Sequence, residues 1–303
     1  MRFTIIGAGG VGGCFGSALR QAGHEVTFFA RGAHLDAIRR QGLTVRSLGG
    51  TAVVRVSATD RVAELPPSDV AVVAVKSYSL PQVIPVVRAA AERGASVLPL
   101  LNGVTAADEL IAGGVPRDCV LGGIARVSAA RIAPGVVERR SDFQSVVVGE
   151  LGGGLSERAT AVADAFRGAG IDARASDIID IELWQKFVFI TALAAVCGMS
   201  RAPVGAVREA PGGRRLIERA VNEVVAVAHA RGVSLPAEEA ERTCAYIGTL
   251  PAAMKPSFLV DLESGGPTEL DTLSGAVARF AAEARIECPV HETARTVLSV
   301  VRP

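Results

Sequence analysis

The 303-residue sequence has few aromatic residues and almost no net charge. Aromatic residues make up 4% of the chain, the formal net charge is +1, and no basic run is longer than a pair. A nucleic-acid partner or an anionic membrane surface is therefore unsupported. No apolar run is convincingly long enough to cross a bilayer, and the N-terminal apolar stretch passes directly into a glycine turn, unlike a signal peptide. We expect no membrane association.

Cysteine is also scarce, and its spacing carries no signal. Five cysteines show neither metal-ligand nor disulfide spacing: Cys14, Cys119, Cys197, Cys244 and Cys288. Such residues behave as small apolar side chains in a reducing compartment, so we expect a cytoplasmic protein without a metal. A composition with 49% hydrophobic residues is typical of a soluble α/β protein with an aliphatic core. A length of 303 residues is enough for two domains.

A glycine-rich turn near the N-terminus is the most informative stretch. An apolar run leads into Gly7, Gly9 and Gly12, a helix-compatible run follows at 14–21, and a strand re-forms at 25–29. This order is typical of a β-α-β dinucleotide site, in which the glycines permit the turn, the approach of a pyrophosphate and close helix packing. Taken alone, the glycines are also compatible with a simple tight loop. The cofactor-binding residues predicted here are Gly7, Ala8, Gly9, Gly10, Val11 and Gly12.

Arg31 follows the second predicted strand and indicates the cofactor. An acidic residue there would bind a ribose 2′-hydroxyl, whereas an arginine suits a 2′-phosphate, so the sequence favours NADP(H) over NAD(H). The alternative is that Arg31 is an ordinary surface charge. His34 and Asp36 lie too far beyond the strand to change the positive charge expected at the 2′-phosphate. Both are interpreted as loop residues.

Polar residues also follow the next two buried strands. Lys76 comes after the strand predicted over 69–75, and Asn102 comes after the strand predicted over 95–101, with a crossover helix at 81–93 between them. In open α/β sheets, ligands bind beyond the carboxyl ends of the strands. Both residues are therefore predicted to face the cofactor crevice, with a solvated turn as the alternative for each.

The strand signals stop near residue 176. Before it we expect short strands at 53–57, 119–124 and 171–175 and a helix at 156–167; residues 135–138 and 144–149 are expected to form a hairpin added at the sheet edge. From 177 the pattern is almost wholly helical. We expect α/β architecture with a Rossmann-type NADP-binding domain at 1–176 and an all-helical domain at 177–303 for substrate binding and dimerisation.

One helix and one later segment in the second domain carry candidate catalytic groups. The helix predicted over 178–197 is apolar all round beyond Lys186, and a lysine at such a place is costly unless it has a partner, a use or a path to the surface. Ser257 and Asp261 lie four residues apart, hence on one face of a helical turn. Thr268 follows a Gly-Gly-Pro break, where it would cap the final helix.

Together these motifs resemble those of the ketopantoate reductase family, the 2-dehydropantoate 2-reductases. The order and spacing agree from one end of the chain to the other. The residues that carry the resemblance are Gly7-Ala-Gly9-Gly10-Val-Gly12, Arg31, Val75-Lys76, Leu101-Asn102-Gly103, Trp184-Gln-Lys186, Ser257 with Asp261, and Pro267-Thr-Glu269-Leu-Asp271.

The resemblance implies an NADPH-dependent reduction of ketopantoate to pantoate, a step of pantothenate biosynthesis. By likeness of position, Lys186 is the general acid and Asn102 contacts both the nicotinamide side and the substrate. Lys76 and Arg31 would hold the cofactor, Glu269 would lie near Lys186 and the cofactor ribose, and Ser257 near the substrate carboxylate. The resemblance also suggests a homodimer.

The chain departs from the family pattern near Lys186. Well-described members carry asparagines one and two helical turns after the lysine, where this chain has Ile190 and Ala194. The pocket should therefore be less polar, which leaves a different 2-oxo acid, or a non-catalytic NADP(H)-binding redox sensor, as alternatives. Arg201 is a hypothetical substitute anchor for the substrate carboxylate.

Overall fold

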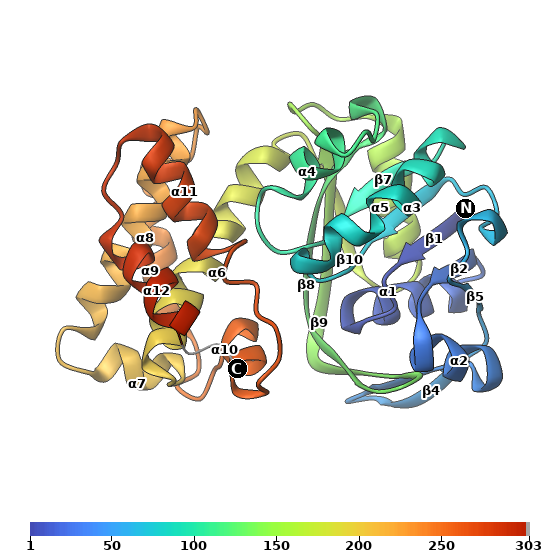
Figure 1. Cartoon of the computed structure of the whole chain (residues 1–303), viewed down its shortest axis with the longest axis horizontal. Coiled ribbons are helices and arrows are strands. Elements are labelled where there is room, and N and C mark those ends of the chain that lie inside the picture. Colours follow the sequence, from blue (N-terminus) through green and yellow to red (C-terminus); the bar gives the residue numbers. More distant parts are fainter. Residues whose placement is uncertain (301–303) are drawn as a thin grey trace. The chain divides into compact units, whose positions relative to one another are not determined.

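The computed structural model describes residues 1–300, which divide into two compact units (Figure 1). Unit 1 comprises Met1–Leu101 and Thr105–Asp180, and unit 2 comprises Asn102–Val104 and the chain from Ile181 onward. The division thus falls four residues after the boundary expected from sequence. It also assigns the short segment 102–104 to the helical unit rather than to the sheet that precedes it.

A five-stranded parallel sheet forms the centre of unit 1. Its order is β5 (Ser57–Thr59), β2 (Glu25–Phe29), β1 (Arg2–Ile6), β6 (Val70–Val73) and β7 (Ser96–Pro99). All four pairings are parallel. Helices α1 (Gly10–Gln21), α2 (Gly32–Gln41), α3 (Leu80–Glu92) and α4 (Ala106–Ala112) connect or follow these strands. This arrangement confirms the Rossmann-type α/β architecture.

Successive side chains along the strands point to opposite faces of the sheet, and unit 1 has an aliphatic core on each face. Ile5 belongs to the core that includes α1 and α5 (Glu157–Gly168), whereas Ile6 belongs to the core on the side of α3. All four residues of β6 are buried. A parallel strand covered on both faces should be apolar throughout, which is the pattern that the sequence shows at this strand.

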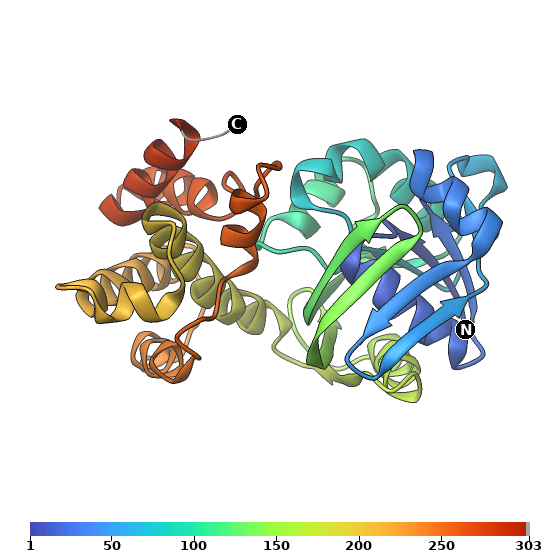
Figure 2. The same ribbon diagram turned by 90° about the horizontal axis from the view of Figure 1, so that it is seen from below.

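A second sheet in unit 1 differs from the predicted edge hairpin. Its order is β10 (Asp172–Ser176), β9 (Val136–Glu150), β3 (Leu43–Ser47) and β4 (Gly50–Val54), and β8 (Leu121–Ala133) pairs antiparallel with β9. Figure 2 shows the long green strands β8 and β9 beside the blue β3 and β4. The predicted segments 135–138 and 144–149 are thus parts of one strand, β9, whose hairpin partner is β8.

Two further strand predictions need correction for related reasons. The predicted hairpin left residues 139–143 between its two strands, but these residues belong to β9, and polar side chains such as those of 139–142 are normal on a sheet that has one face toward solvent. The strand expected over 53–57 is instead the end of β4 and the start of β5, which belong to different sheets. Strand β3 was not predicted at all.

Unit 2 is helical throughout its described part, as predicted. Between residues 181 and 300 the structure has no strand. Its helices are α6 (Ile179–Ser200), which begins two residues before the unit, α7 (Val204–Glu209), α8 (Gly213–Ala230), α9 (Glu239–Thr249), α10 (Ser257–Glu263), α11 (Ser274–Ala284) and α12 (Pro289–Val300). Thr268 does not cap the final helix, because α11 begins only at Ser274 and α12 at Pro289. That prediction was wrong.

Helix α6 is the apolar centre of unit 2. By length and composition alone its 22 residues would suffice to cross a membrane, and it is the one such helix among residues 1–300. However, 61% of the apolar window is buried inside the fold, as expected of a core helix. Trp184, Phe187, Val188 and Leu193 of this helix are buried in the core of unit 2.

Candidate active site

The glycine turn after β1 has a conformation that side chains would disrupt. Gly7 has φ +103°, and a Cβ there would lie 2.8 Å from the Ala74 carbonyl oxygen. A Cβ at Gly12 would lie 2.0 Å from the Gly7 carbonyl oxygen, so helix α1 packs closely against the end of β1. At Gly9, in contrast, a Cβ would meet nothing within 4 Å. Two glycines are thus required by the fold, and the third borders open space.

The N-terminus of α1 is open to an anion. Gly9 is its N-cap, no side chain accepts from its first N–H groups, and its first turn contains no acidic residue. Within residues 1–300 the Gly9 N–H has no acceptor, while the Gly13 N–H is bonded to the Gly9 carbonyl at 2.7 Å. Free N–H groups at a helix N-terminus attract phosphate through hydrogen bonds and the helix dipole. The donors and the open space at Gly9 therefore fit a bound pyrophosphate.

The register of the parallel sheet brings the other predicted cofactor residues to the same edge. Ile6 is paired with Phe29 and with Val73, so β1, β2 and β6 end at one level. Arg31 follows β2 and Lys76 follows β6. Sequence order together with strand register therefore places the glycine turn, Arg31 and Lys76 beyond the carboxyl ends of adjacent strands.

Arg31 is exposed and held by two weak contacts. Its guanidinium lies 5.6 Å from the centroid of the Phe29 ring and donates a hydrogen bond of 3.3 Å to the Gln82 carbonyl. Neither contact neutralises its charge. Lys76 is half-buried and immediately precedes a 3₁₀ turn over Ser77–Ser79. Arg31 and Lys76 are thus the two basic residues that follow β2 and β6.

A hydrogen-bonded cluster in unit 2 joins three predicted site residues. Lys186 Nζ donates to Asn102 Oδ1 at 3.1 Å, and Asn102 Nδ2 donates to Glu269 Oε2 at 3.0 Å. The amide must have this orientation, because an ammonium group only donates and a carboxylate only accepts. Asn102 thus bridges a cation and an anion that are 83 residues apart in the chain (269 − 186).

The backbone around the cluster explains why these segments meet. Glu269 is 5% exposed, and its carbonyl accepts from the N–H groups of Thr272 and Leu273 in a turn that leads to α11. Gly103 has φ +94°, and a Cβ there would lie 2.4 Å from Thr272 Cγ2. The glycine after Asn102 therefore allows the 102–104 segment to approach the turn that carries Glu269.

Ser257, the other predicted substrate contact, lies on α10, and the two departures from the family pattern lie on α6. Ser257 is the exposed first residue of α10, and Asp261 follows one turn later on the same helix. Ile190 is half-buried one turn beyond Lys186, and Ala194, one turn further, is 3% exposed and belongs to the core. The face of α6 beyond Lys186 is therefore apolar.

Arg201 is poorly placed for the role suggested from sequence. It follows the last residue of α6 in a left-handed conformation, with φ +53°. Lys186 and Ser200 are fourteen residues apart on this one helix, which at 1.5 Å per residue is about 21 Å. That distance exceeds the length of a small 2-oxo acid, so the structure argues against Arg201 as an anchor for a substrate bound at Lys186.

The family model described as "Ketopantoate reductase PanE/ApbA" matches residues 3–153, and its C-terminal counterpart matches residues 179–302. The chain belongs to the ketopantoate reductase family. It is 33% identical to a 2-dehydropantoate 2-reductase of Halobacterium salinarum, covering all of this chain and 98% of that one. It is 30% identical to the uncharacterized oxidoreductase YkpB of Bacillus subtilis, covering 97% of this chain and 96% of that one.

Solved structures agree with this membership. A 2-dehydropantoate 2-reductase from Methylococcus capsulatus superimposes with a TM-score of 0.88 at 26% identity, covering 99% of this chain and 96% of that one. D-mandelate dehydrogenase in complex with NADH and anilino(oxo)acetate has a TM-score of 0.90 at 22% identity, covering 100% and 98%; this match shows the fold alone. The ketopantoate reductase family member described here is a pyridine-nucleotide-dependent oxidoreductase.

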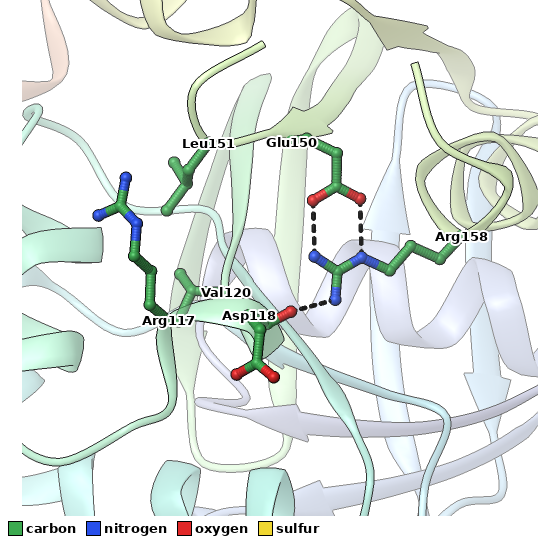
Figure 3. A pocket seen from close by; sticks show the side chains of 6 residues that line it. All are labelled: Arg117, Asp118, Val120, Glu150, Leu151 and Arg158. Atoms are coloured by element: carbon green, nitrogen blue, oxygen red, sulfur yellow. Dashed lines mark hydrogen bonds and ion pairs between the residues drawn. The ribbon is translucent and has the colours of Figure 1, made fainter. Parts of the chain in front are cut away.

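Two surface hollows of this family member are lined by none of the predicted site residues. One, in unit 1, has a volume of about 440 Å³ (Figure 3). There Arg158 donates to both Glu150 oxygens, at 2.7 and 2.6 Å, and holds the pKa of that carboxyl below its usual value. The other, in unit 2, is lined by Met199, Leu216, Arg219, Asn222, Glu223, Pro289, Val290 and Thr293. Within residues 1–300 no cluster of three His, Cys, Asp or Glu residues is arranged to hold a metal.

Sequence reasoning missed one residue that contacts the glycine turn. His34 and Asp36 are helical residues of α2 rather than loop residues, and His34 is 5% exposed. His34 Nε2 lies 2.7 Å from the Ala8 carbonyl oxygen. The available signal was the position of His34 among the apolar residues Leu35 and Ile38 on a helix that begins directly after β2.

Proposed function

We propose that this chain reduces the 2-oxo group of a small carboxylic acid with NADPH, and that ketopantoate is the first substrate to test. The observation that carries this proposal is the bridged cluster of Lys186, Asn102 and Glu269. A lysine supported in this way is suited to donate a proton at a defined position. Membership of the ketopantoate reductase family supports the same reaction.

The proposed cofactor site lies in unit 1. The turn residues Gly7 to Gly12 would hold the pyrophosphate, with Arg31 at the 2′-phosphate and Lys76 as a second cation. A bound NADPH supplies the hydride that reduces the substrate. The choice of NADPH over NADH rests on Arg31, whose exposed guanidinium can donate two parallel hydrogen bonds to a phosphate.

The proposed acid–base role belongs to Lys186. As the 2-oxo carbon is reduced, negative charge develops on its oxygen, and an adjacent ammonium group stabilises that charge most strongly in the transition state. Lys186 Nζ then transfers a proton to this oxygen to give the 2-hydroxy acid, and it is reprotonated from solvent. Asn102 fixes the direction of the ammonium group, and the Glu269 carboxylate orients Asn102.

A second candidate is a less polar 2-oxo acid, and a specific observation favours it. Ile190 and Ala194 follow Lys186 along one face of α6, where they offer no hydrogen-bond donor to a substrate hydroxyl or carboxylate. A site that leaves a substrate hydroxyl without a partner disfavours that substrate. Ser257 stays a predicted carboxylate contact in both cases.

We infer a cytoplasmic location for this reaction. The five cysteines are all unpaired, which supports a reducing compartment. The homodimer suggested by the family resemblance stays a prediction.

Substrate profiling tests the proposal. Oxidation of NADPH and of NADH would be followed with ketopantoate and with 2-oxo acids that carry aliphatic or aromatic side chains. We expect turnover with NADPH and little with NADH. If ketopantoate is poor and apolar acids are good, the double variant Ile190→Asn with Ala194→Asn should shift the preference toward ketopantoate. Tight NADPH binding without reduction of any of these acids would contradict the reductase proposal and favour a redox sensor.

A further inference from the structure

Buried His34 links the glycine turn to the second sheet of unit 1. Besides the contact of Nε2 with the Ala8 carbonyl, its Nδ1 accepts a hydrogen bond from the Gly135 N–H at 2.8 Å. Gly135 lies at the turn between β8 and β9, and its own carbonyl accepts from the Thr44 N–H at 2.8 Å in β3. A continuous chain of hydrogen bonds therefore runs from the glycine turn through His34 of α2 to the β8–β9 turn and then to β3.

These bonds define the protonation state of the imidazole. A backbone N–H can only donate, so Nδ1 must carry a lone pair; a carbonyl can only accept, so Nε2 must carry the proton. His34 is thus the neutral Nε2–H tautomer. Burial lowers the pKa of His34, and the charge of Arg131 on β8 lowers it further, so that this form persists at neutral pH.

The bond to Ala8 also sets the direction of the next N–H group. The peptide unit is planar and trans, so the Ala8 carbonyl and the Gly9 N–H point in opposite directions. With the carbonyl held by His34, the Gly9 N–H points away from α2. That N–H has no acceptor within residues 1–300, and the space beside Gly9 is open.

We propose that His34 is a positioning residue for cofactor binding, which acts by fixing the Ala8–Gly9 peptide so that the Gly9 N–H faces the cofactor pyrophosphate. The inference rests on the proposed dinucleotide function of the turn. His34 does not touch the reacting atoms in this account. Its effect should therefore be on nucleotide affinity and on the order of the turn rather than on the rate of the chemical step.

Two near-isosteric substitutions separate the two hydrogen bonds of His34. The His34→Gln side chain is long enough to donate from Nε2 to Ala8. The His34→Asn side chain has an oxygen in the place of Nδ1, which accepts from Gly135, but it is too short to reach Ala8. Both variants lose the ring and both should lower stability. Only the asparagine variant should lose the bond that positions the Gly9 N–H.

The measurements are the NADPH dissociation constant by fluorescence titration, kcat at saturating NADPH, and hydrogen exchange of the amides of residues 7–13 without nucleotide. For His34→Asn we expect a dissociation constant raised about tenfold, faster exchange in the turn and kcat within about twofold, since one neutral hydrogen bond is lost. For His34→Gln we expect all three to stay within about threefold.

His291 of unit 2 provides the matched control. It is also a buried histidine bonded on both sides, with Nε2 at 2.9 Å from the Ala220 carbonyl and Nδ1 at 3.2 Å from Ser274 Oγ. We expect His291→Gln to lower stability without changing NADPH affinity or exchange in the turn.

Equal NADPH affinities and equal exchange in wild type and His34→Asn would overturn the proposal, as would equal losses in the glutamine and asparagine variants. If wild-type protein binds neither NADPH nor NADH, the proposed function itself fails, and the role of His34 toward a nucleotide fails with it. The titration of wild-type protein distinguishes the two failures: it shows nucleotide binding if only the role of His34 is wrong, and no binding if the proposed function is wrong.

Discussion

Unit 1 and unit 2 bring their polar residues together in different ways. In unit 1, the register of parallel strands and three glycines place the turn, Arg31 and Lys76 at one edge of a sheet. In unit 2, the cluster depends on Asn102 meeting Lys186, 84 residues later, and Glu269, 167 residues later. The proposed cofactor-binding residues are thus positioned by local sequence and strand register, whereas the proposed acid–base residues are brought together by tertiary packing.

The two buried histidines extend this comparison. His34 joins the nucleotide turn to the second sheet, while His291 joins α12 to α8 and α11. Both side chains bond a backbone carbonyl through Nε2. Only His34 contacts a residue of the predicted cofactor site, so identical chemistry should have a functional consequence in one unit and a purely structural one in the other.

The largest expected effect separates catalysis from cofactor binding. Lys186→Ala should lower kcat about 10³-fold, because the proton donor and its charge are both lost. The dissociation constant for NADPH should change less than about threefold. Lys255→Ala is the control, since Lys255 is an exposed lysine paired with Glu263 at 2.7 Å. A loss of activity accompanied by an equal loss of NADPH affinity would contradict the division of roles.

The next effect concerns the choice of nucleotide. Arg31→Ala should weaken NADPH binding about 10- to 100-fold and leave NADH binding nearly unchanged, because charge-assisted hydrogen bonds to the 2′-phosphate are lost. Arg20→Ala serves as a control on the same unit, since Arg20 donates to the backbone carbonyls of Arg55 and His24, both at 3.4 Å. Titration of both variants with both nucleotides measures the effect. Equal losses for NADPH and NADH would show that Arg31 does not recognise the 2′-phosphate.

A smaller effect is a loss of the stability of unit 2 at acid pH. Burial lowers the pKa of His291 to about 4 from an ordinary value of 6.5. The unfolded state therefore binds more protons than the folded state between these values, so stability is full above pH 6.5 and is lost as the pH falls toward 4. When the pH falls from 7 to 5, this histidine should lower the free energy of unfolding by about 2 kcal/mol.

Urea unfolding followed by tryptophan fluorescence measures this loss in the right unit, because Trp184 is the single tryptophan of the chain and lies in the core of unit 2. In His291→Gln the dependence on pH should be weaker by about the same amount. An unchanged pH dependence in this variant would show that His291 titrates normally.

The smallest expected effect concerns Arg201, the hypothetical anchor for the substrate carboxylate. Arg201→Ala should leave the Michaelis constant for the substrate within about twofold, since about 21 Å of helix separates Lys186 from the end of α6. Steady-state kinetics with the best acid from the substrate panel measures this. A tenfold increase would show that the substrate reaches the far end of the helix.

Much of unit 1 was predictable because its signals are local. Strand β2 was predicted with its exact bounds, and the glycine turn identified α1. Strand β9 was divided wrongly because its polar middle resembles a turn. His34 was assigned to a loop although the apolar residues Leu35 and Ile38 indicate a helix, and nothing local shows that its side chain reaches back to Ala8. Thr268 was misassigned because a Gly-Gly-Pro break resembles a helix start, although α11 begins only at Ser274.

In unit 2 the residues of the cluster were predictable, but their contacts were not. A lysine before an apolar helical run signals a special position, yet nothing local shows that Asn102 lies between Lys186 and Glu269. The resemblance to the family predicted only that Glu269 lies near Lys186, and the structure adds the hydrogen bonds through Asn102.

Isotope transfer tests the central claim most directly. NADPH that carries deuterium at both C4 positions of the nicotinamide would be incubated with the best 2-oxo acid of the panel, and the product would be analysed by mass spectrometry and NMR. The account predicts one deuterium at C2 of the 2-hydroxy acid with wild-type protein and almost no product with Lys186→Ala. Product without deuterium, or full activity of the Lys186 variant, would contradict it.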